Sequence, residues 1–256
     1  LNIWLKYKLP DYLKNKTDYI VQFKNLNVEL GTGNISATDI SLNSKNPLNT
    51  DVIGLKGTIE KLSISRFAMY DLLYHKRISS KDLVLSKPNL SIILATPKEQ
   101  KTGKKRNPVK FENITIDDGN IVIYQANKQK FFSVKNLFLD VQNLQLTEEA
   151  IESLLPVVFD QYKIKGDGFF FRPDVAYAIT AQHITTENGK MTVKKFQFTP
   201  LLSVQQFQKY FPKRNKLISF SADEMDFTDI ILKNQQISLA NMSFQNPKLK
   251  MFTSTS

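Results

Sequence analysis

The stretch ISATDISL, residues 35–42, combines two patterns that together define a bent β-strand. Apolar and polar residues alternate on either side of its centre, as in a strand with one buried face. The step from Ala37 to Ile40 is three residues, however, and a regular strand would put these two side chains on opposite faces. One extra residue at Thr38-Asp39 restores the phase, as a β-bulge does, and bends the strand. We therefore expect a bent strand with one continuous apolar face.

The same frame recurs four more times, starting at Ile78, Phe132, Met191 and Ile237. The apolar positions of the five copies are Ile35, Ala37, Ile40 and Leu42; Ile78, Ser80, Leu83 and Leu85; Phe132, Val134, Leu137 and Leu139; Met191, Val193, Phe196 and Phe198; and Ile237, Leu239, Met242 and Phe244, with Ser80 the polar exception. The second position is always Ser or Thr. A bend at one place per repeat predicts a sheet curled into a trough, and an ordinary β-sandwich with unrelated bulges is the alternative.

Further strands are expected at residues 19–30, 58–64, 109–116 and 121–124, where apolar and β-branched residues alternate with polar ones. The glycine-containing segments 31–34, 117–120 and 188–189 are typical of hairpin turns, and 166–168 is also expected to be a turn. Pro47, Pro88, Pro200 and Pro247 follow apolar runs and are expected at strand ends, because proline cannot donate to a ladder.

Three short helices are predicted, and each is interpreted as a cap over the core rather than as a membrane-binding face. Thr147 is expected to cap residues 148–159, which carry an apolar stripe and a helix-breaking Pro156. Ser203 is expected to cap residues 204–211, with Phe207 turned inward. Residues 67–75 form the third candidate.

These patterns predict a mainly β protein with an elongated, curved antiparallel sheet of repeated strand units, open like a groove, and a few short helices. Residues 19–256 form this domain. The chain begins at Leu1 without methionine, and residues 1–8 mix aromatic and basic side chains, as segments leaving a membrane do. We expect residues 1–18 to be a juxtamembrane segment that follows an anchor preceding the sequence.

Signals of enzymatic chemistry are poor. The chain has no cysteine and two histidines, His75 and His183, which lie far apart, so thiolate and histidine-rich metal sites are excluded. Phosphate-binding and nucleophile-elbow motifs are absent from the sequence. The acidic segment 117–120 is interpreted as a hairpin turn rather than a calcium site, and 223–229 lacks the ligand spacing of a known calcium loop. We expect a non-enzymatic protein with neither cofactor nor metal.

The net charge is +11, which favours contact with an anionic surface but is spread along the chain. Its densest part is a basic loop made of Lys98, Lys101, Lys104, Lys105, Arg106 and Lys110. The segment has no apolar periodicity and is interpreted as a solvated loop, with contact to anionic lipid as the alternative. Nucleic acid is not expected as a partner, because no aromatic residue is interleaved with the charges.

The sequence resembles the AsmA-like family, which is related to TamB-type and repeating β-groove lipid-transfer proteins. The resemblance rests on KLPDY at residues 8–12, on GNISA at 33–37 and on the run from Ile78 to Leu94. It implies an anchor in the bacterial inner membrane, an elongated β-structure on the periplasmic side, and a role in lipid transport or outer-membrane assembly. Phospholipid or another membrane lipid, the inner membrane and other envelope proteins are the partners that it implies.

A curved sheet with an apolar inner face provides a binding surface for acyl chains. The candidate lining residues are Ile40, Leu42, Leu83, Leu85, Leu137, Leu139, Phe196, Phe198, Met242 and Phe244. The alternative is that these residues fill a closed core and touch no ligand, in which case the protein is a structural or interaction scaffold. A polyanion-binding module is a third and weaker hypothesis.

Overall fold

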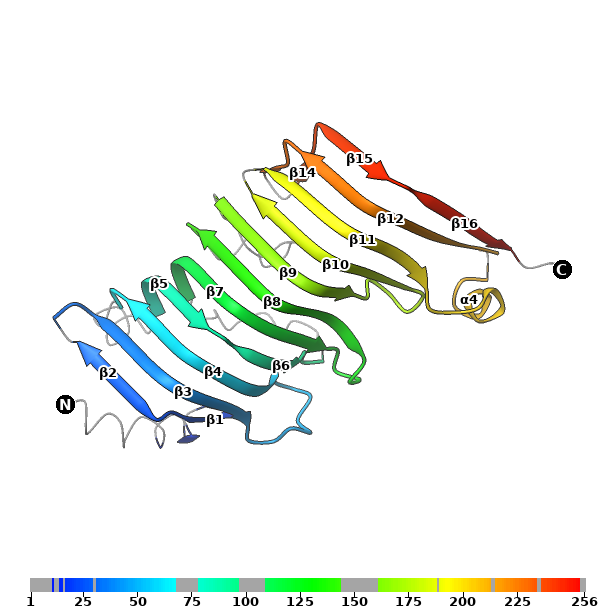
Figure 1. Ribbon diagram of the computed structural model, residues 1–256. Coiled ribbons are helices and arrows are strands. Elements are labelled where there is room, and N and C mark those ends of the chain that lie inside the picture. Colours follow the sequence, from blue (N-terminus) through cyan, green and yellow to red (C-terminus); the bar gives the residue numbers. More distant parts are fainter. Residues whose placement is uncertain are drawn as a thin grey trace.

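A single-layered, strongly curved β-sheet makes up most of the described part of the computed structural model (Figure 1). The structure describes residues 11, 14–15, 17–29, 31–67, 78–96, 109–143, 161–187, 189–212, 215–233 and 236–253. The strands are β1 (Tyr19–Gln22), β2 (Asn25–Glu29), β3 (Asn34–Ser44), β4 (Gly54–Ser65), β5 (Ile78–Ser86), β6 (Asn89–Ile93), β7 (Val109–Tyr124), β8 (Lys130–Gln142), β9 (Gln161–Phe171), β10 (Tyr177–Glu187), β11 (Lys190–Pro200), β12 (Lys216–Thr228), β13 (Ile231–Lys233), β14 (Gln236–Ser238), β15 (Asn241–Gln245) and β16 (Lys248–Thr253). The prediction of a mainly β, curved and open sheet is confirmed.

The strands follow one another across the sheet in the order β1, β3, β4, β5, β7, β8, β9, β10, β11, β12 and β15, and β13 and β14 pair separately. All neighbours are antiparallel except at one junction. There β7 runs parallel to β5 and β6, with Leu83 opposite Ile114 and Leu90 opposite Ile121. The sheet is therefore mixed, and the expectation of a wholly antiparallel sheet is wrong at this junction.

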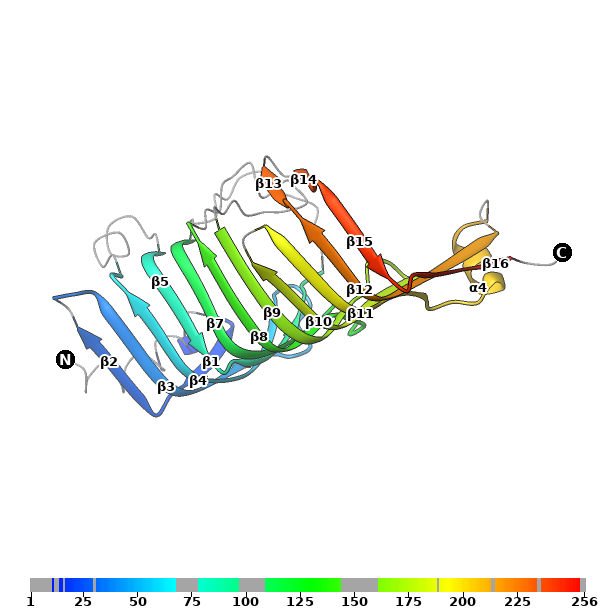
Figure 2. The ribbon, with the colours of Figure 1, turned by 45° about the horizontal axis from the view of Figure 1, so that its top comes forward.

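Three pairs of short strands behave as single bent strands. The register of β3 with β1, in which Tyr19 faces Ser44, continues unbroken into β2, where Asn25 faces Thr38. The pair β5 and β6 follows β4 and β7 in the same way, and β15 and β16 follow β12. Eleven bent strands thus lie side by side, and Figure 2 shows them curving together.

The bends form one row across the sheet, which we call the crease. We define it by one residue per bent strand: Lys24, Asp39, Glu60, Lys87, Asp118, Asn136, Gly168, Gln182, Lys195, Asp223 and Asn246. In β3, β8 and β11 the crease residue is the fifth position of the repeat, where a bend is predicted. Its φ is 51° at Asp39, 48° at Asn136 and 52° at Lys195. A residue in this left-handed conformation shifts the alternation of side chains between the two faces by one position. The inward side chains on either side of it are therefore three residues apart instead of two.

The second copy of the repeat bends elsewhere than predicted, because β5 is uninterrupted at 81–82 and the left-handed residue is Lys87, with φ of 47°, directly before Pro88. The fifth copy is divided between β14 and β15 with a bend at Ala240, close to the predicted place, and a further left-handed residue, Asn246, has φ of 48° directly before Pro247. True register shifts are found between β7 and β8 and between β8 and β9. In the other pairs, both strands have one additional residue at the crease. The residues on either side of the crease therefore keep the same pairing register.

The remaining local predictions divide between confirmed and wrong. The turn at 31–34 lies between β2 and β3, and Gly189, the described residue of the turn predicted at 188–189, is in a turn between β10 and β11. The segments 117–120 and 166–168 are not turns, because they lie inside β7 and β9 at the crease. Asp118 and Gly168 have left-handed φ there, and left-handed bends use the same residue types as hairpin turns.

One predicted helix is described, α4 (Val204–Tyr210), and it is capped as expected. The Ser203 side chain accepts a hydrogen bond from the Gln206 backbone, and the Gln206 side chain accepts one from the Ser203 backbone. Phe207 packs with Ala176 and Leu217 at one end of β10–β12. The predicted helix at 67–75 lies outside the described residues except for Phe67, which is not helical. The predicted helix at 147–159, the loop at 97–108 and the segment 1–10 also lie outside them. Among the described residues, no helix has the length and apolar character needed to span a membrane.

Candidate functional site

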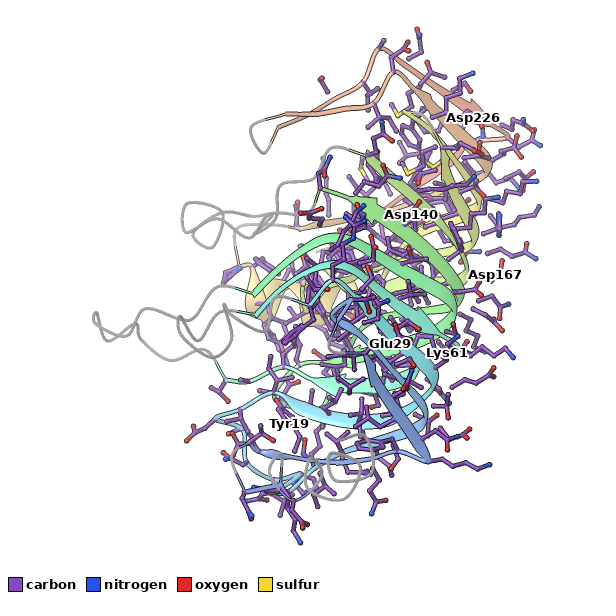
Figure 3. The ribbon with its side chains drawn as sticks, turned by 90° about the vertical axis from the view of Figure 1, so that its left-hand side faces the viewer. Tyr19, Glu29, Lys61, Asp140, Asp167 and Asp226 are labelled. Atoms are coloured by element: carbon purple, nitrogen blue, oxygen red, sulfur yellow. The ribbon has the colours of Figure 1, made fainter. Side chains whose placement is uncertain are left out.

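The concave face of the bent sheet is an apolar trough that runs the full width of the sheet. Directly opposed residues of neighbouring strands share a face, so the register identifies the lining. Ile40 faces Ile59, and Met225 faces Phe244. Lys61, which is adjacent to the inward Leu62, and Asp167 lie on the outer side of the bend in Figure 3. The two faces of the sheet are therefore chemically distinct.

All ten predicted lining residues lie on this concave face. Leu42 is opposite Gly57 of β4, which is in turn opposite Leu90. Three further apolar pairs are directly opposed on this face: Leu62 and Leu85, Ile116 and Leu139, and Phe198 and Phe220. Ile40, Leu42 and Leu85 join one buried cluster, while Leu85, Leu137 and Leu139 join the next. Met242 and Phe244 lie on the last strand, where 50% and 36% of their surfaces are exposed.

The ten candidate residues leave out the strands between the copies, of which β4 and β7 were predicted as strands and β9, β10 and β12 were not. These five strands also line the trough, with residues that include Ile59, Ile116, Ile121, Phe169, Phe220 and Met225. The signal that identifies them is the same three-residue step between inward residues. It separates Ile59 from Leu62 in β4 and Ala222 from Met225 in β12.

The bottom of the trough is buried, whereas its walls are half exposed. Ile40, Val134 and Ala181, which flank the crease, are 5%, 4% and 4% exposed. Gly119 and Gly166 also lie at the bottom, where the bend brings neighbouring side chains together. A Cβ on Gly166 would lie 2.5 Å from the Val134 Cγ2 atom. Small residues at the crease thus allow the sheet to fold tightly, and larger residues line its walls.

The lining changes in character along the sheet. From β1 to β7 it consists mostly of Ile, Leu and Val, together with Ala37 and Phe23, while from β8 onward it is rich in phenylalanine. The Phe196 and Phe220 rings lie 6.0 Å apart, the Phe220 and Phe244 rings lie 5.5 Å apart, and Tyr177 stacks on Phe198 at 4.4 Å. Aromatic pairs at these distances contribute about 0.5–1.5 kcal/mol each beyond the apolar area that they bury.

The convex side of the crease carries polar pairs between neighbouring strands. Glu60 accepts from Lys87 at 2.9 Å, and Asp223 accepts from Lys195 at 2.8 Å and from Asn246 at 2.9 Å. The hydrogen bonds from Lys195 and Asn246, together with the charge of Lys195, lower the pKa of Asp223. These pairs are exposed, so they contribute little stability and chiefly keep the bend polar outside.

The outer face of the bend also carries a carboxylate–imidazole–hydroxyl relay. His183 Nδ1 lies 2.7 Å from Asp167 Oδ1, and His183 Nε2 lies 2.8 Å from the Thr185 hydroxyl. Asn136 donates to the other Asp167 oxygen at 3.0 Å, and this bond, followed by that of His183, lowers the pKa of Asp167. This order of groups is that of an oriented general base. These four side chains do not themselves supply the oxyanion donors and substrate pocket that catalysis requires.

A second polar cluster lines an open depression on the convex face, between β2 and β7. Its lining includes Glu29, Ser36, Ser63, Asp82 and Thr115. The Asp82 carboxylate accepts hydrogen bonds from Ser65 and from Asn113. Burial acts to raise the pKa of Asp82, but these two bonds and the charges of Lys81 and Arg66 outweigh it and lower the pKa.

The other predicted positions do not converge on a site. Residues 98–106 of the basic loop lie outside the described residues, and Lys110 lies in β7. Asp223, Glu224 and Asp226 each pair with a neighbouring strand, through Lys195, Lys194 and Thr192. Within the described ranges, no three His, Asp or Glu side chains are grouped so that they could hold a metal. A comparison with protein-family models and a search of curated proteins both found no match.

Proposed function

We propose that this chain is a non-enzymatic lipid-binding or lipid-transfer module of the cell envelope, which holds acyl chains in its concave trough. The observation that carries the proposal is the apolar lining from Val21 in β1 to Met251 in β16, which is interrupted by the buried Thr186 in β10 and whose walls remain half exposed. A sheet that faced only solvent would gain nothing from such a lining, because exposed apolar patches of this extent mark binding surfaces.

Simple dimensions and energies support lipid as the ligand. Eleven bent strands at the usual spacing give a trough about 50 Å long. The hydrocarbon core of a bilayer is about 30 Å thick, or roughly 15 Å for each leaflet, so the trough has room for more than one lipid. Each methylene that leaves water for such a surface contributes about 0.8 kcal/mol. The net charge of +11 favours lipids with anionic head groups.

We place the module on the periplasmic side of the bacterial inner membrane, in the AsmA-like family. The support is the resemblance of residues 8–12, 33–37 and 78–94, together with a sheet of repeated bent strands of the kind that the resemblance implies. In this proposal residues 1–18 follow an inner-membrane anchor, and the trough conveys lipid or supports outer-membrane assembly with other envelope proteins.

The test is native mass spectrometry, with lipid extraction, of the chain purified from a bacterial envelope. The wild-type chain is expected to carry phospholipid. The double variant Leu85→Asp and Leu139→Asp places two carboxylates on the trough surface and is expected to lose it, because burying an unpaired charge against acyl chains is costly.

A matched control comes from the residues next to these two in the sequence. Val84 and Phe138 lie on the same strands but on the convex face, opposite Ser63 and Lys165. Val84→Asp with Phe138→Asp adds the same charge to the other side of the sheet and is expected to keep the lipid. Circular dichroism checks that both variants fold. A folded wild-type chain without lipid, or equal loss in both variants, contradicts the proposal.

A ligand-free scaffold is the second candidate. It is favoured by the buried bottom of the trough, where Ile40, Val134 and Ala181 pack against other apolar residues of the sheet. In this case the trough lining serves to hold the strands together and contacts no ligand.

A further inference from the structure

The crease divides the sheet into two arms that differ in charge. We call one of them the basic arm, and it consists of residues 19–22, 40–44, 54–59, 89–93, 119–124, 130–135, 169–171, 177–181, 196–200, 216–222 and 248–253. These segments contain lysine but neither Asp nor Glu. In the other arm lysines are mixed with carboxylates, and Lys163 pairs with Glu187 there at 2.7 Å. Positive charge is therefore uncompensated within the strands of the basic arm.

Two exposed lysines lie on the convex face of the basic arm. Lys56 in β4 faces Asn43 on one side and Ser91 on the other. The Nζ atom of Lys130 lies 4.7 Å from the centre of the Phe170 ring. Neither lysine forms an ion pair with a carboxylate of the described residues. Both lie within the first three residues of their strands, so they adjoin the loops that precede these strands.

The loops at the free end of the basic arm form a rim, which we call the lip. It consists of residues 45–53 between β3 and β4, 125–129 between β7 and β8, 172–176 between β9 and β10, and 201–212, which include α4. Figure 1 shows these connections following one another along one long side of the sheet. Among the described residues before Leu239, every exposed large apolar side chain lies on the lip or, for Ile218, in the adjoining start of β12. Those of the lip are Leu48, Ile53, Val175, Leu201 and Tyr210.

Exposed cations accompany these apolar side chains on the lip. Leu48 is 76% exposed and Tyr210 is 61% exposed. The carboxylates of the lip are Asp51 and Asp174, and Asp174 accepts hydrogen bonds from two backbone N–H groups of its own loop. Three of the loops carry an exposed lysine: Lys45, Lys128 and Lys209. Apolar and aromatic side chains next to lysines are typical of segments that enter the interface of a bilayer.

An anionic bilayer fits the lip better than a nucleic acid or a protein does. Its acyl region accepts apolar side chains such as Leu48, and its phosphates attract lysines at the level of the head groups. A nucleic acid would bind the lysines but would leave the apolar side chains in water. A protein interface has a compact apolar core, whereas the apolar side chains of the lip lie on separate loops. A fluid bilayer accommodates separate loops.

We propose that the lip docks on the head-group region of an anionic bilayer, with Lys56 and Lys130 at the level of the phosphates. Leu48, Leu201 and Tyr210 then leave water for the interface. One long side of the trough lies at the membrane, next to the acyl chains that the trough is proposed to hold. The docking itself rests on the lip and does not require that the trough binds lipid.

Sedimentation with vesicles tests the docking. The wild-type chain is expected to bind vesicles that contain phosphatidylglycerol and to bind vesicles of phosphatidylcholine alone far more weakly. Leu48→Asn is expected to weaken the binding about tenfold, because an apolar side chain no longer leaves water on docking. Leu239→Asn is the matched control, since Leu239 is also exposed but lies outside the lip, directly before β15. This control is expected to bind as the wild-type chain does.

A second pair of variants tests the charge. Lys56→Gln with Lys130→Gln is expected to weaken binding to the phosphatidylglycerol vesicles roughly twentyfold, because each lysine near an anionic surface is attracted to it. Lys61→Gln with Lys165→Gln removes the same charge from exposed positions on the convex face of the other arm. These two lysines lie farther from the lip than the Debye length of about 8 Å, so this control is expected to bind as the wild-type chain does.

A fluorescent label locates the contact, because the chain has no native cysteine. A polarity-sensitive dye on Leu48→Cys is expected to brighten when phosphatidylglycerol vesicles are added. The same dye on Thr32→Cys, in the exposed turn between β2 and β3, is expected to stay unchanged. An absence of vesicle binding, or an equal response of both dyes, overturns the proposal. Binding that Leu48→Asn leaves intact while the lysine variant loses it overturns the proposal in favour of a polyanion-binding surface.

The trough variant separates this result from the proposed function. Leu85→Asp with Leu139→Asp is expected to lose the lipid of the trough and still to bind vesicles as the wild-type chain does. If this variant loses vesicle binding while Leu48→Asn keeps it, the trough lining contacts the bilayer in place of the lip, and the docking proposal is overturned. Circular dichroism checks that every variant folds.

Discussion

Strands β3 and β4 bend at the same level of the sheet, but they do so differently. Asp39 in β3 has a left-handed backbone with φ of 51°, whereas Glu60, which lies opposite in β4, does not have a positive φ. The same contrast separates β11 from both of its neighbours. Lys195 has φ of 52° and lies between Gln182 of β10 and Asp223 of β12, neither of which has a positive φ.

The contrast indicates two kinds of strand. Some bend because they contain a left-handed residue at the crease, and others, which we call following strands, bend because they are hydrogen-bonded to such a strand. A left-handed residue costs about 1 to 2 kcal/mol unless it is glycine. If every strand required one, the cost would rise with the width of the sheet. Because register continues across the crease between β3 and β4 and between β10, β11 and β12, a strand paired to a left-handed one bends with it through its own hydrogen bonds. The following predictions test this division, from the largest effect to the smallest.

The largest loss of stability is expected at Gly57, where the following strand β4 packs closely against β6. Gly57 in β4 lies against β6, and a Cβ there would be 2.1 Å from the Asn89 carbonyl oxygen, which is backbone and cannot move aside easily. We expect Gly57→Ala to lower the free energy of unfolding by about 3 kcal/mol. Urea unfolding measures this. Gly31→Ala is the control, since nothing lies within 4 Å of its added Cβ, and equal loss in both variants would contradict the assignment.

The next effect separates a left-handed residue from its follower directly. Gly168 has φ of 57°, and an added Cβ meets only the Lys135 Cδ atom at 3.9 Å, so conformation rather than space limits this position. We expect Gly168→Val to cost about 2 kcal/mol, because a β-branched residue is disfavoured at positive φ. Gln182→Val, one strand away on the crease, is expected to be nearly neutral. Similar losses at both positions in urea unfolding would show that both strands set the bend.

Two adjacent lysines give a finer comparison within one strand. Lys194 and Lys195 are both exposed and both face a carboxylate, Glu224 and Asp223, but only Lys195 has a positive φ. We expect Lys195→Thr to lower the free energy of unfolding by about 1 kcal/mol through the backbone. Lys194→Thr, at a position that favours β-branched residues, is expected to have no effect or to stabilise slightly. Thermal unfolding at high salt removes the ion-pair contribution from both, and equal melting temperatures would contradict the prediction.

The bend and the trough could be predicted from the sequence because both are local. The odd step from Ala37 to Ile40 follows from alternation alone, and the structure places a left-handed residue inside it. The ten predicted lining residues lie on one face for the same reason. What local pattern did not reveal was the lining from β9, β10 and β12, since those strands bend without matching the chosen frame.

Two features of the fold were beyond local reasoning for physical reasons. The parallel pairing of β5 and β6 with β7 depends on where the chain returns after Ile93, and this is a long-range choice. Asp118 and Gly119 were expected in a hairpin turn because Asp and Gly favour left-handed φ in turns and in bends alike. A hairpin turn ends the strand, whereas a bend lies within a strand whose neighbours continue past it. The sequence of one strand does not show whether its neighbours continue.

The smallest expected effect is the acid dependence of the polar pairs that cover the crease. Asp167 has a lowered pKa in the folded chain, through Asn136 and then His183, so the unfolded chain binds more protons in the acid range. Stability is therefore full above the ordinary carboxyl pKa and is lost as pH falls through the lowered value. Since Asp167 is largely exposed, we expect less than about 1 kcal/mol from it after solvent screening. Asp167→Asn is expected to flatten this part of the pH dependence in urea unfolding. A variant whose pH dependence is the same as that of the wild-type chain would contradict the assignment of this acid sensitivity to Asp167 at the crease.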